Sequence, residues 1–450
     1  WGKRAGEVTN AGDSIVEYER WRDLGDPAIL ESIERYNEDD CVSTQMLRNW
    51  LEGLRPAPIS ASEIELAEVP NVDDWAQERE AFEVQRRELA ERIRRQTALE
   101  PELQELIAEM LWFHQRSQKP LWWAIFDRQT WTDDELTEDP ESLGELKLLG
   151  QIQEKRSYVA TYAFPPQDTK LKVGDRPRIA LTLEPGGSIL ALEPEVGRVV
   201  LKRGTKAGDF PEQCSLSPGS VIKQTVLVDA VMAFAGRIAA GEFGVDRAML
   251  DFLRKLPPRL TGRTPNSPVI DQAEDLVAGT VRAVRSLNDS ALIIQGPPGT
   301  GKTYTTARAI LALLRDGRRV AVSSNSHKAI NNVLAAVSMA ARTEKFTFCG
   351  VKKGSGNAPD THFQDEFIET VLSSDDVTLD HQLVGATAFH FAGEALNTFD
   401  HLFVDEAGQV SLGNLISMSG CARNLVLVGD QMQLPQPVQG THPGRTGYST

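Results

Sequence analysis

Gly296-Pro297-Pro298-Gly299-Thr300-Gly301-Lys302-Thr303 is the stretch of sequence that decides the fold. It fits the pattern G-x-x-x-x-G-K-[ST], follows the apolar run 291–294 and precedes a helical pattern of apolar residues. A glycine-rich turn between a buried strand and a helix lets backbone N–H groups close around phosphates at the positive end of the helix. The stretch therefore predicts a phosphate-binding loop, in which Lys302 reaches the β and γ phosphates and Thr303 binds Mg²⁺.

A second pattern places two carboxylates at the end of another buried strand. The apolar residues 402–404 are followed directly by Asp405 and Glu406. Alone, this pattern is more typical of a strand that meets solvent. Together with the phosphate loop, it predicts that Asp405 holds the metal and that Glu406 activates the attacking water.

Composition limits the kinds of protein that the chain can be. Its 450 residues, 41% hydrophobic and 25% charged, are enough for about three globular domains. The net charge of −16 argues against binding nucleic acid by bulk attraction, so any contact with a strand must be a local groove. The sequence contains no membrane-spanning stretch and no export signal. Its four cysteines are scattered singly, which fits a reducing cytoplasm and predicts a cytoplasmic protein.

Changes in the spacing of apolar residues and turn residues along the chain predict a multidomain α/β protein. A helical pattern begins at Asp26-Pro27, and short apolar runs separated by turn residues after Gly150 predict a small β-barrel or sandwich. Strands alternating with helices after Pro268 predict a parallel sheet. The expected strands lie near Leu292, Val320, Phe346, Val384, Phe403 and Val426. The expected segments are 1–54, 55–148 (linker and helices), 149–221 (barrel), 222–264 (helices and linker) and 265–450 (the phosphate-loop domain).

Four short segments and one glutamine around the phosphate loop resemble the motifs of superfamily 1 helicases. Residues 405–409 look like motif II, 429–435 like motif III, 324–329 like motif Ia, and 385–388 like the strand-contacting motif between Ia and II. Gln272 is similar to the adenine-reading glutamine of the Q motif. The segments follow one another in the order expected for the superfamily, and the pattern is most similar to its Upf-like branch.

The resemblance implies a RecA-like ATPase domain preceded by a β-barrel on stalk helices, with ATP and Mg²⁺ as cofactors. It implies movement from 5′ to 3′ along a single strand. It also places Ser326, His327 and Thr387 near the strand backbone, and Gln433 between the γ-phosphate and the strand. Considered alone, His327 would fit a capping or core histidine equally well, and only its position in motif Ia favours a strand contact.

The N-terminal segment carries a further resemblance. Tyr36 and Asp40 match Y-x-x-x-D, the third motif of RNase H-like 3′ to 5′ exonucleases, which implies that Asp40 is a metal ligand. Such chemistry needs several carboxylates around two metals about 4 Å apart, so one helix cannot perform it. An acidic helix surface is the alternative. The order of nuclease then helicase is similar to that of bacterial RecB-like nuclease-helicase fusions.

The sequence also predicts that the chain is a fragment. It begins at Trp1 rather than Met, and Thr450 follows Pro435 too closely for another domain. We expect that a second RecA-like domain and upstream nuclease modules are missing, and that this piece alone is nearly inactive.

The predicted function is that of an ATP-dependent helicase or translocase on single-stranded DNA, within a DNA-processing helicase-nuclease. Two alternatives stay open. One is an RNA helicase of the Upf-like type, because the motifs do not separate users of DNA from users of RNA. The other is an ATP-gated nucleic-acid clamp that does not translocate.

Overall fold

The structure is a computed structural model that describes residues 17–53, except 19 and 23, and residues 74–447, except 220, 265, 266, 357 and 437–439. The side chains of residues 40, 51–53 and 74–79 are outside the described part. The chain divides into two compact units, Trp1–Glu80 and Ala81–Thr450. None of the described helices is both long and apolar enough to span a membrane.

The first unit contains helix α2, Pro27–Gly53. Proline is well suited to the first position of a helix, and the side chain of Asp26 accepts a hydrogen bond of 3.0 Å from the backbone N–H of Ala28. The predicted start at Asp26-Pro27 is therefore confirmed. Tyr36 lies on this helix, half-buried.

The second unit is built on a parallel sheet of seven strands in the order β10-β9-β11-β8-β12-β13-β7. Every ladder between these strands is parallel. The strands are β7 (Ala291–Gln295), β8 (Val320–Ser323), β9 (Gly350–Lys353), β10 (Ile368–Val371), β11 (Leu383–Gly385), β12 (Phe399–Val404) and β13 (Ala422–Gly429). The predicted α/β class with a parallel sheet is confirmed.

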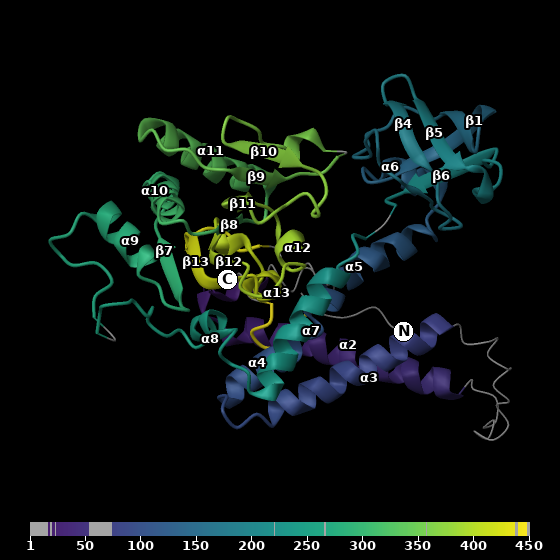
Figure 1. Ribbon diagram of the computed structural model, residues 1–450. Coiled ribbons are helices and arrows are strands. Elements are labelled where there is room, and N and C mark those ends of the chain that lie inside the picture. The colour runs from purple at the N-terminus through teal and green to yellow at the C-terminus, as the bar shows by residue number, and fades with distance from the viewer. Residues whose placement is uncertain are drawn as a thin grey trace. The chain divides into compact units, whose positions relative to one another are not determined.

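Helices cover both faces of this sheet (Figure 1). Because side chains alternate along a strand, Leu402 and Val404 of β12 enter one core and Phe403 enters the other. The core around Phe403 contains α9 (Leu276–Arg285), α10 (Lys302–Arg315) and α11 (His327–Thr343). The opposite core contains α7 (Thr225–Ala240), α8 (Arg247–Leu253), α12 (Ala388–Phe391) and α13 (Leu412–Ser419).

Further helices contribute to the core that contains α7, α8, α12 and α13. They are α3 (Asp74–Arg94), α4 (Pro101–Met110) and α5 (Phe113–Arg128), and α6 (Asp133–Glu138) follows them along the chain. A buried contact joins α5 to α13, because the Nε2 of His114 lies 3.2 Å from the Oγ of Ser417. A side chain at Gly413 would clash with the ring of Phe113, so α5 and α13 pack closely here.

Six antiparallel strands form a second sheet with its own hydrophobic core, in the order β3-β6-β1-β2-β5-β4. Strand β1 runs across the predicted domain boundary at residue 149. The other predicted domain boundaries stay predictions. No ladder joins the edge strands β3 and β4 among the described residues, so a closed barrel also stays a prediction. The strands are β1 (Leu143–Glu154), β2 (Ser157–Ala163), β3 (Arg178–Ile179), β4 (Ser188–Glu193), β5 (Arg198–Gly204) and β6 (Gln213–Ser217).

The strand expected near Phe346 is misplaced, and β10 was not expected at all. After α11 the chain turns at Lys345, whose φ is 51°. Phe346 packs against the helix-covered core, the ring of Phe348 stacks on Phe367 at 5.2 Å, and β9 begins only at Gly350. The apolar run thus fills the space under the helices instead of pairing in the sheet.

We predict that His401 makes the fold sensitive to acid. Its Nε2–H donates to the carbonyl of Val284 at 3.1 Å, and its Nδ1 has no hydrogen-bond partner among the described residues. Burial lowers its pKa from 6.5 to about 4. As the pH falls from about 6.5 to about 4, His401 is protonated in the unfolded chain but stays neutral in the folded chain. The free energy of unfolding therefore decreases over this range. Urea unfolding at about pH 7 and pH 5 should show that His401→Leu reduces the difference between the two pH values by about 1–2 kcal/mol.

The comparison of two pH values separates titration from packing, because the packing cost of the substitution is the same at both. An equal pH difference in the parent and in His401→Leu would contradict the prediction.

Candidate nucleotide-binding site

The loop between β7 and α10 has the backbone geometry of a phosphate cradle. Gly299 has a φ of 79°, and Gly301, the N-cap of α10, has a φ of 84°, a left-handed conformation that L-residues adopt only with strain. A Cβ on Gly296 would lie 2.7 Å from the Oγ1 of Thr300. The glycines are therefore required by the shape of the loop, and the predicted strand, loop and helix are confirmed.

Lys302 begins α10 and folds back over the loop. Its Nζ donates to the carbonyls of Gly296 at 2.6 Å and Pro297 at 3.1 Å. Carbonyl oxygens hold the ammonium here, where the oxygens of a phosphate could replace them. Thr303 follows, half-buried, in the first turn of the helix.

Asp405 follows directly after β12 and is buried, with 7% of its surface exposed. Its backbone N–H donates to the carbonyl of Ser323 at 2.9 Å, which ties the end of β12 to the end of β8. Burial, and then the charge of Glu406, raise the pKa of Asp405 to about 6, while the charge of Lys302 acts in the opposite direction. A buried carboxylate that is only partly neutralised is suited to a cation, and Mg²⁺ typically takes one or two protein carboxylates and keeps its waters.

Glu406 adopts a left-handed conformation with φ 49° and ψ 45°. A residue with a side chain rarely adopts this region, and such strain is common where a functional group must be held in place. The short helix η3, Ala407–Gln409, follows at once. The carboxylate of Glu406 is thus placed beside Asp405 at a cost in backbone energy.

The segment after β13 packs against the segment after β12. A Cβ on Gly429 would lie 3.3 Å from the backbone nitrogens of Ala407 and Gly408, so only glycine allows this approach without displacement. The backbone N–H of Gly296 donates to the carbonyl of Gly429 at 3.1 Å. The side chain of Gln409 donates to the Oε1 of Gln433 at 3.4 Å. The phosphate loop and the predicted motifs II and III therefore form one connected cluster.

The predicted strand-contacting residues lie on neighbouring loops, because β8 pairs with β11. Ser326 is the N-cap of α11, and its side chain accepts a hydrogen bond of 3.1 Å from the backbone N–H of Ala329. Thr387 is the N-cap of α12 but makes no capping bond with its side chain. His327 is half-buried, and its Nδ1 lies 2.9 Å from the Nζ of Lys352. Ser326 thus has a structural role whatever else it contacts.

Gln272 is a predicted site residue that the structure does not join to this cluster, and the predicted metal ligand Asp40 lies in the other compact unit. Gln272 is exposed in the turn before α9, and within the described part of the chain no hydrogen bond joins it to the phosphate loop. Its role with adenine stays a prediction. Asp40 lies on α2, but its side chain is outside the described part of the chain.

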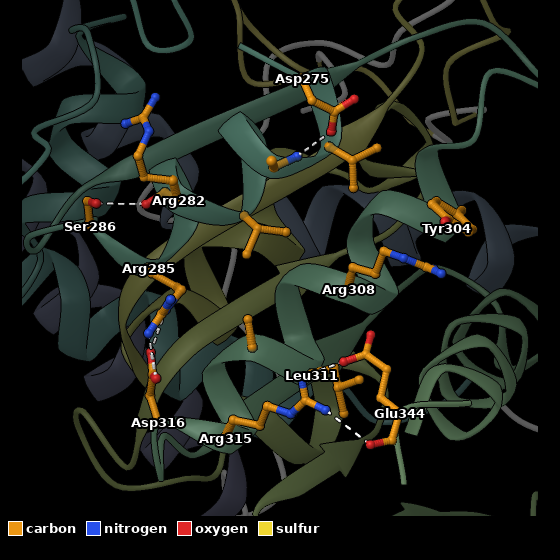
Figure 2. A pocket seen from close by; sticks show the side chains of 14 residues that line it. Asp275, Arg282, Arg285, Ser286, Tyr304, Arg308, Leu311, Arg315, Asp316 and Glu344 are labelled. Carbon is orange, nitrogen blue, oxygen red and sulfur yellow. Dashed lines mark hydrogen bonds and ion pairs between the residues drawn. The ribbon is translucent and has the colours of Figure 1, made fainter. Parts of the chain in front are cut away.

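An open hollow of about 830 Å³ lies between α9 and α10 (Figure 2). Its arginines are largely paired, Arg285 with Asp316 at 2.6 Å and Arg315 with Glu344. The phosphate loop and Asp405 do not line this hollow. It is therefore not the nucleotide site.

The sequence did not predict the roles of two residues that contact predicted site residues, Lys352 beside His327 and Gln409 beside Gln433. Lys352 looks like a solvated basic residue at a strand end, but it is fully buried, with 0% of its surface exposed. Gln409 lies within the motif II segment and has no role predicted from the sequence, because its bond to Gln433 depends on how the two loops meet. Only the tertiary structure shows either contact.

The fold and the site together define a class: a phosphate-loop ATPase domain built on a parallel sheet. Comparison with known proteins agrees. A family model described as an AAA domain matches residues 280–439, and one described as the RNase_H superfamily matches residues 2–52.

The chain is similar to proteins named DNA replication ATP-dependent helicase/nuclease. It is 32% identical to JHS1 of Arabidopsis thaliana over 175 residues, and 30% identical to DNA2 of Saccharomyces cerevisiae over 163 residues. These matches cover 36% and 35% of this chain, but only 12% and 10% of the two relatives. A crystal structure of the Arterivirus nonstructural protein 10 helicase aligns with 70% of this chain and 52% of its own, at 13% identity and a TM-score of 0.26, too low to support an argument. Over these segments the chain is therefore similar to named helicase/nucleases, of which it spans only a small part.

We predict that Glu406 destabilises the fold through its backbone. Glu406→Gly should be more stable than Glu406→Ala by about 1 kcal/mol, because both variants lack the carboxylate and only glycine relieves the left-handed strain. Urea unfolding of the two variants measures the difference.

The same pair at Glu88, an exposed position in helix α3, is the matched control. There alanine should be the more stable by about 1 kcal/mol, since glycine is unfavourable in a helix. If alanine were also the more stable at position 406, the strain argument would fail.

Proposed function

We propose that this chain binds and hydrolyses Mg²⁺-ATP and couples hydrolysis to movement along single-stranded DNA, as part of a helicase-nuclease. The observation that carries the proposal is the connected cluster of the phosphate loop, Asp405-Glu406 and Gly429–Gln433 at one edge of one sheet. Phosphoryl transfer needs mainly positioning and charge, and this cluster offers both.

Each residue of the cluster has a role in the proposal. Lys302 neutralises charge on the β and γ phosphates, and the Thr303 hydroxyl and Asp405 hold Mg²⁺, directly or through water. Glu406 accepts the proton of the attacking water. Gln433, bonded to Gln409, links the γ-phosphate to the strand. Bound Mg²⁺ would supply charge stabilisation at the transferring phosphoryl group.

The choice of DNA rests on the relatives, whose names describe DNA replication helicase/nucleases. The RNase_H superfamily match at residues 2–52 supports a joined nuclease, in which Asp40 would be one metal ligand. Movement from 5′ to 3′, the barrel on its stalk and the similarity to RecB-like fusions belong to the same proposal. An RNA oligonucleotide tests the Upf-like RNA alternative: stimulation of ATP turnover by RNA and not by DNA would favour it.

The first test separates ATP binding from ATP hydrolysis. Lys302→Ala should weaken the binding of a fluorescent ATP analogue about tenfold or more, because the charge that faces the phosphates is lost. Glu406→Gln should bind the analogue as the parent does but release phosphate at least about a hundredfold more slowly in a single turnover.

Lys206→Ala, which removes an equal charge from an exposed position in η1 (Thr205–Ala207), is the control and should change neither value. Hydrolysis by Glu406→Gln at the parent rate would remove Glu406 as the base. A rate of hydrolysis that does not depend on strand length would favour the ATP-gated clamp over the motor.

The second test concerns the strand contacts. The double variant Ser326→Ala with Thr387→Ala should bind a single-stranded oligonucleotide about tenfold more weakly, with little dependence on base, because contacts to the backbone position a strand without reading it. Affinities are compared at one fixed salt concentration.

Loss of a helix N-cap lowers the free energy of unfolding by about 1 kcal/mol by itself. A control variant that loses a different N-cap is therefore needed. Thr132→Ala removes the N-cap of α6, which accepts from the backbone N–H of Glu135 at 3.3 Å. Unchanged strand affinity in the double variant, or an equal loss in Thr132→Ala, would place the strand elsewhere.

A further inference from the structure

A buried lysine lies behind the loop that carries Ser326 and His327. Lys352 is the third residue of β9, and its side chain is fully enclosed. Its Nζ lies 2.9 Å from the Nδ1 of His327 and donates to the carbonyl of Lys353 at 2.8 Å. Among the described residues, no carboxylate bonds to this ammonium. A buried ammonium without such a partner is rare, so this pairing requires an explanation.

The neighbouring charged groups do not neutralise Lys352. Lys353 directs its own Nζ to the carbonyl of Gly354 at 2.9 Å, away from His327. Asp360 on η2 (Pro359–Thr361) is the acid that acts on His327, opposed by Lys353 and by His362 after η2. On α12, His390 experiences the charges of both lysines.

These surroundings keep the imidazole neutral. Burial, then the charge of Lys352, lower the pKa of His327 to about 4. Burial, then the charge of Lys353, lower the pKa of Lys352 to about 8, so Lys352 is still an ammonium at pH 7. An ammonium has hydrogens to donate and no lone pair to accept. The Nδ1 of His327 must therefore accept, and the single ring proton must be on Nε2.

We propose that Lys352 is a positioning residue that holds His327 as a neutral imidazole with its one N–H at Nε2, available to donate to the backbone of the bound strand. The contact between His327 and a bound nucleic-acid strand rests on the proposed function, whereas the assignment of the ring proton to Nε2 does not. A neutral donor marks the position of a phosphate without adding a charge. His327 should then contribute affinity but no salt dependence, unlike a lysine contact.

The tautomer is tested directly in the parent chain. Nitrogen NMR of the histidine-labelled protein at about pH 7 should show the Nδ1 of His327 as an unprotonated ring nitrogen and the Nε2 as a protonated one. The reverse assignment, or an imidazolium, would overturn the proposal without any variant.

The second arm compares Lys352→Met with Lys353→Met, which removes a neighbouring lysine that does not bond to His327. Exchange of the ring C–H hydrogens, followed by mass spectrometry, gives the pKa of His327. It should rise above about 4 in Lys352→Met, while remaining below the ordinary value because the burial of the ring is unchanged, and it should change much less in Lys353→Met.

The pH dependence of oligonucleotide binding distinguishes a positioning role of Lys352 from a purely structural one, because a structural role alone would not change it. As the pH falls from about 7.5 to about 5.5, Lys352→Met should bind a labelled oligothymidylate about twofold more tightly because His327 gains partial charge, relative to the change in Lys353→Met. His327→Gln, which retains a donor at the place of Nε2, should bind more tightly than His327→Asn.

The outcomes separate the two proposals. An unchanged pKa of His327 in Lys352→Met overturns the positioning role, whatever the strand does. A raised pKa without any effect of pH on strand binding, together with equal affinities for His327→Gln and His327→Asn, removes His327 from the strand contact and overturns that part of the proposed function.

Discussion

The parallel pairing of β12 between β8 and β13 is the constraint on which the rest of the site depends. Because parallel strands end at the same edge of a sheet, the segments that follow β8, β12, β13 and β7 emerge side by side. The sheet can hold this order because both of its faces are covered by helices. Residues far apart in the chain thus interact, since the charge of Lys302 acts to lower the pKa of Asp405.

The site gives up stability to hold its carboxylates in place. Asp405 is buried where its charge is disfavoured, and Glu406 is held in a strained conformation. Natural proteins tolerate such costs where the surrounding fold determines the geometry and function requires it. Here the close approach at Gly429 and the bond between Gln409 and Gln433 supply that surrounding support.

Helix α13, which follows the carboxylates and the short helix η3, also connects the site to helices α5 and α7. α13 begins at Leu412, and its N-cap Ser411 accepts from the backbone N–H of Asn414 at 3.2 Å. Further along, Ser417 contacts His114 of α5 and donates to the carbonyl of Leu227 in α7 at 3.1 Å. The segment after β12 is therefore linked to both α5 and α7 through α13.

The sequence by itself determined the class of the fold and the identity of the phosphate loop, because strand and helix periods and the glycines of 296–303 are local properties. It could not place Phe346, whose apolar side chain suits a strand and a helix-covered core equally well. It could not find Lys352, since burial depends on what packs over β9 from elsewhere in the chain. The tertiary structure alone decided the strand order, the strain at Glu406 and the bond between Lys352 and His327, because each arises where segments distant in sequence meet.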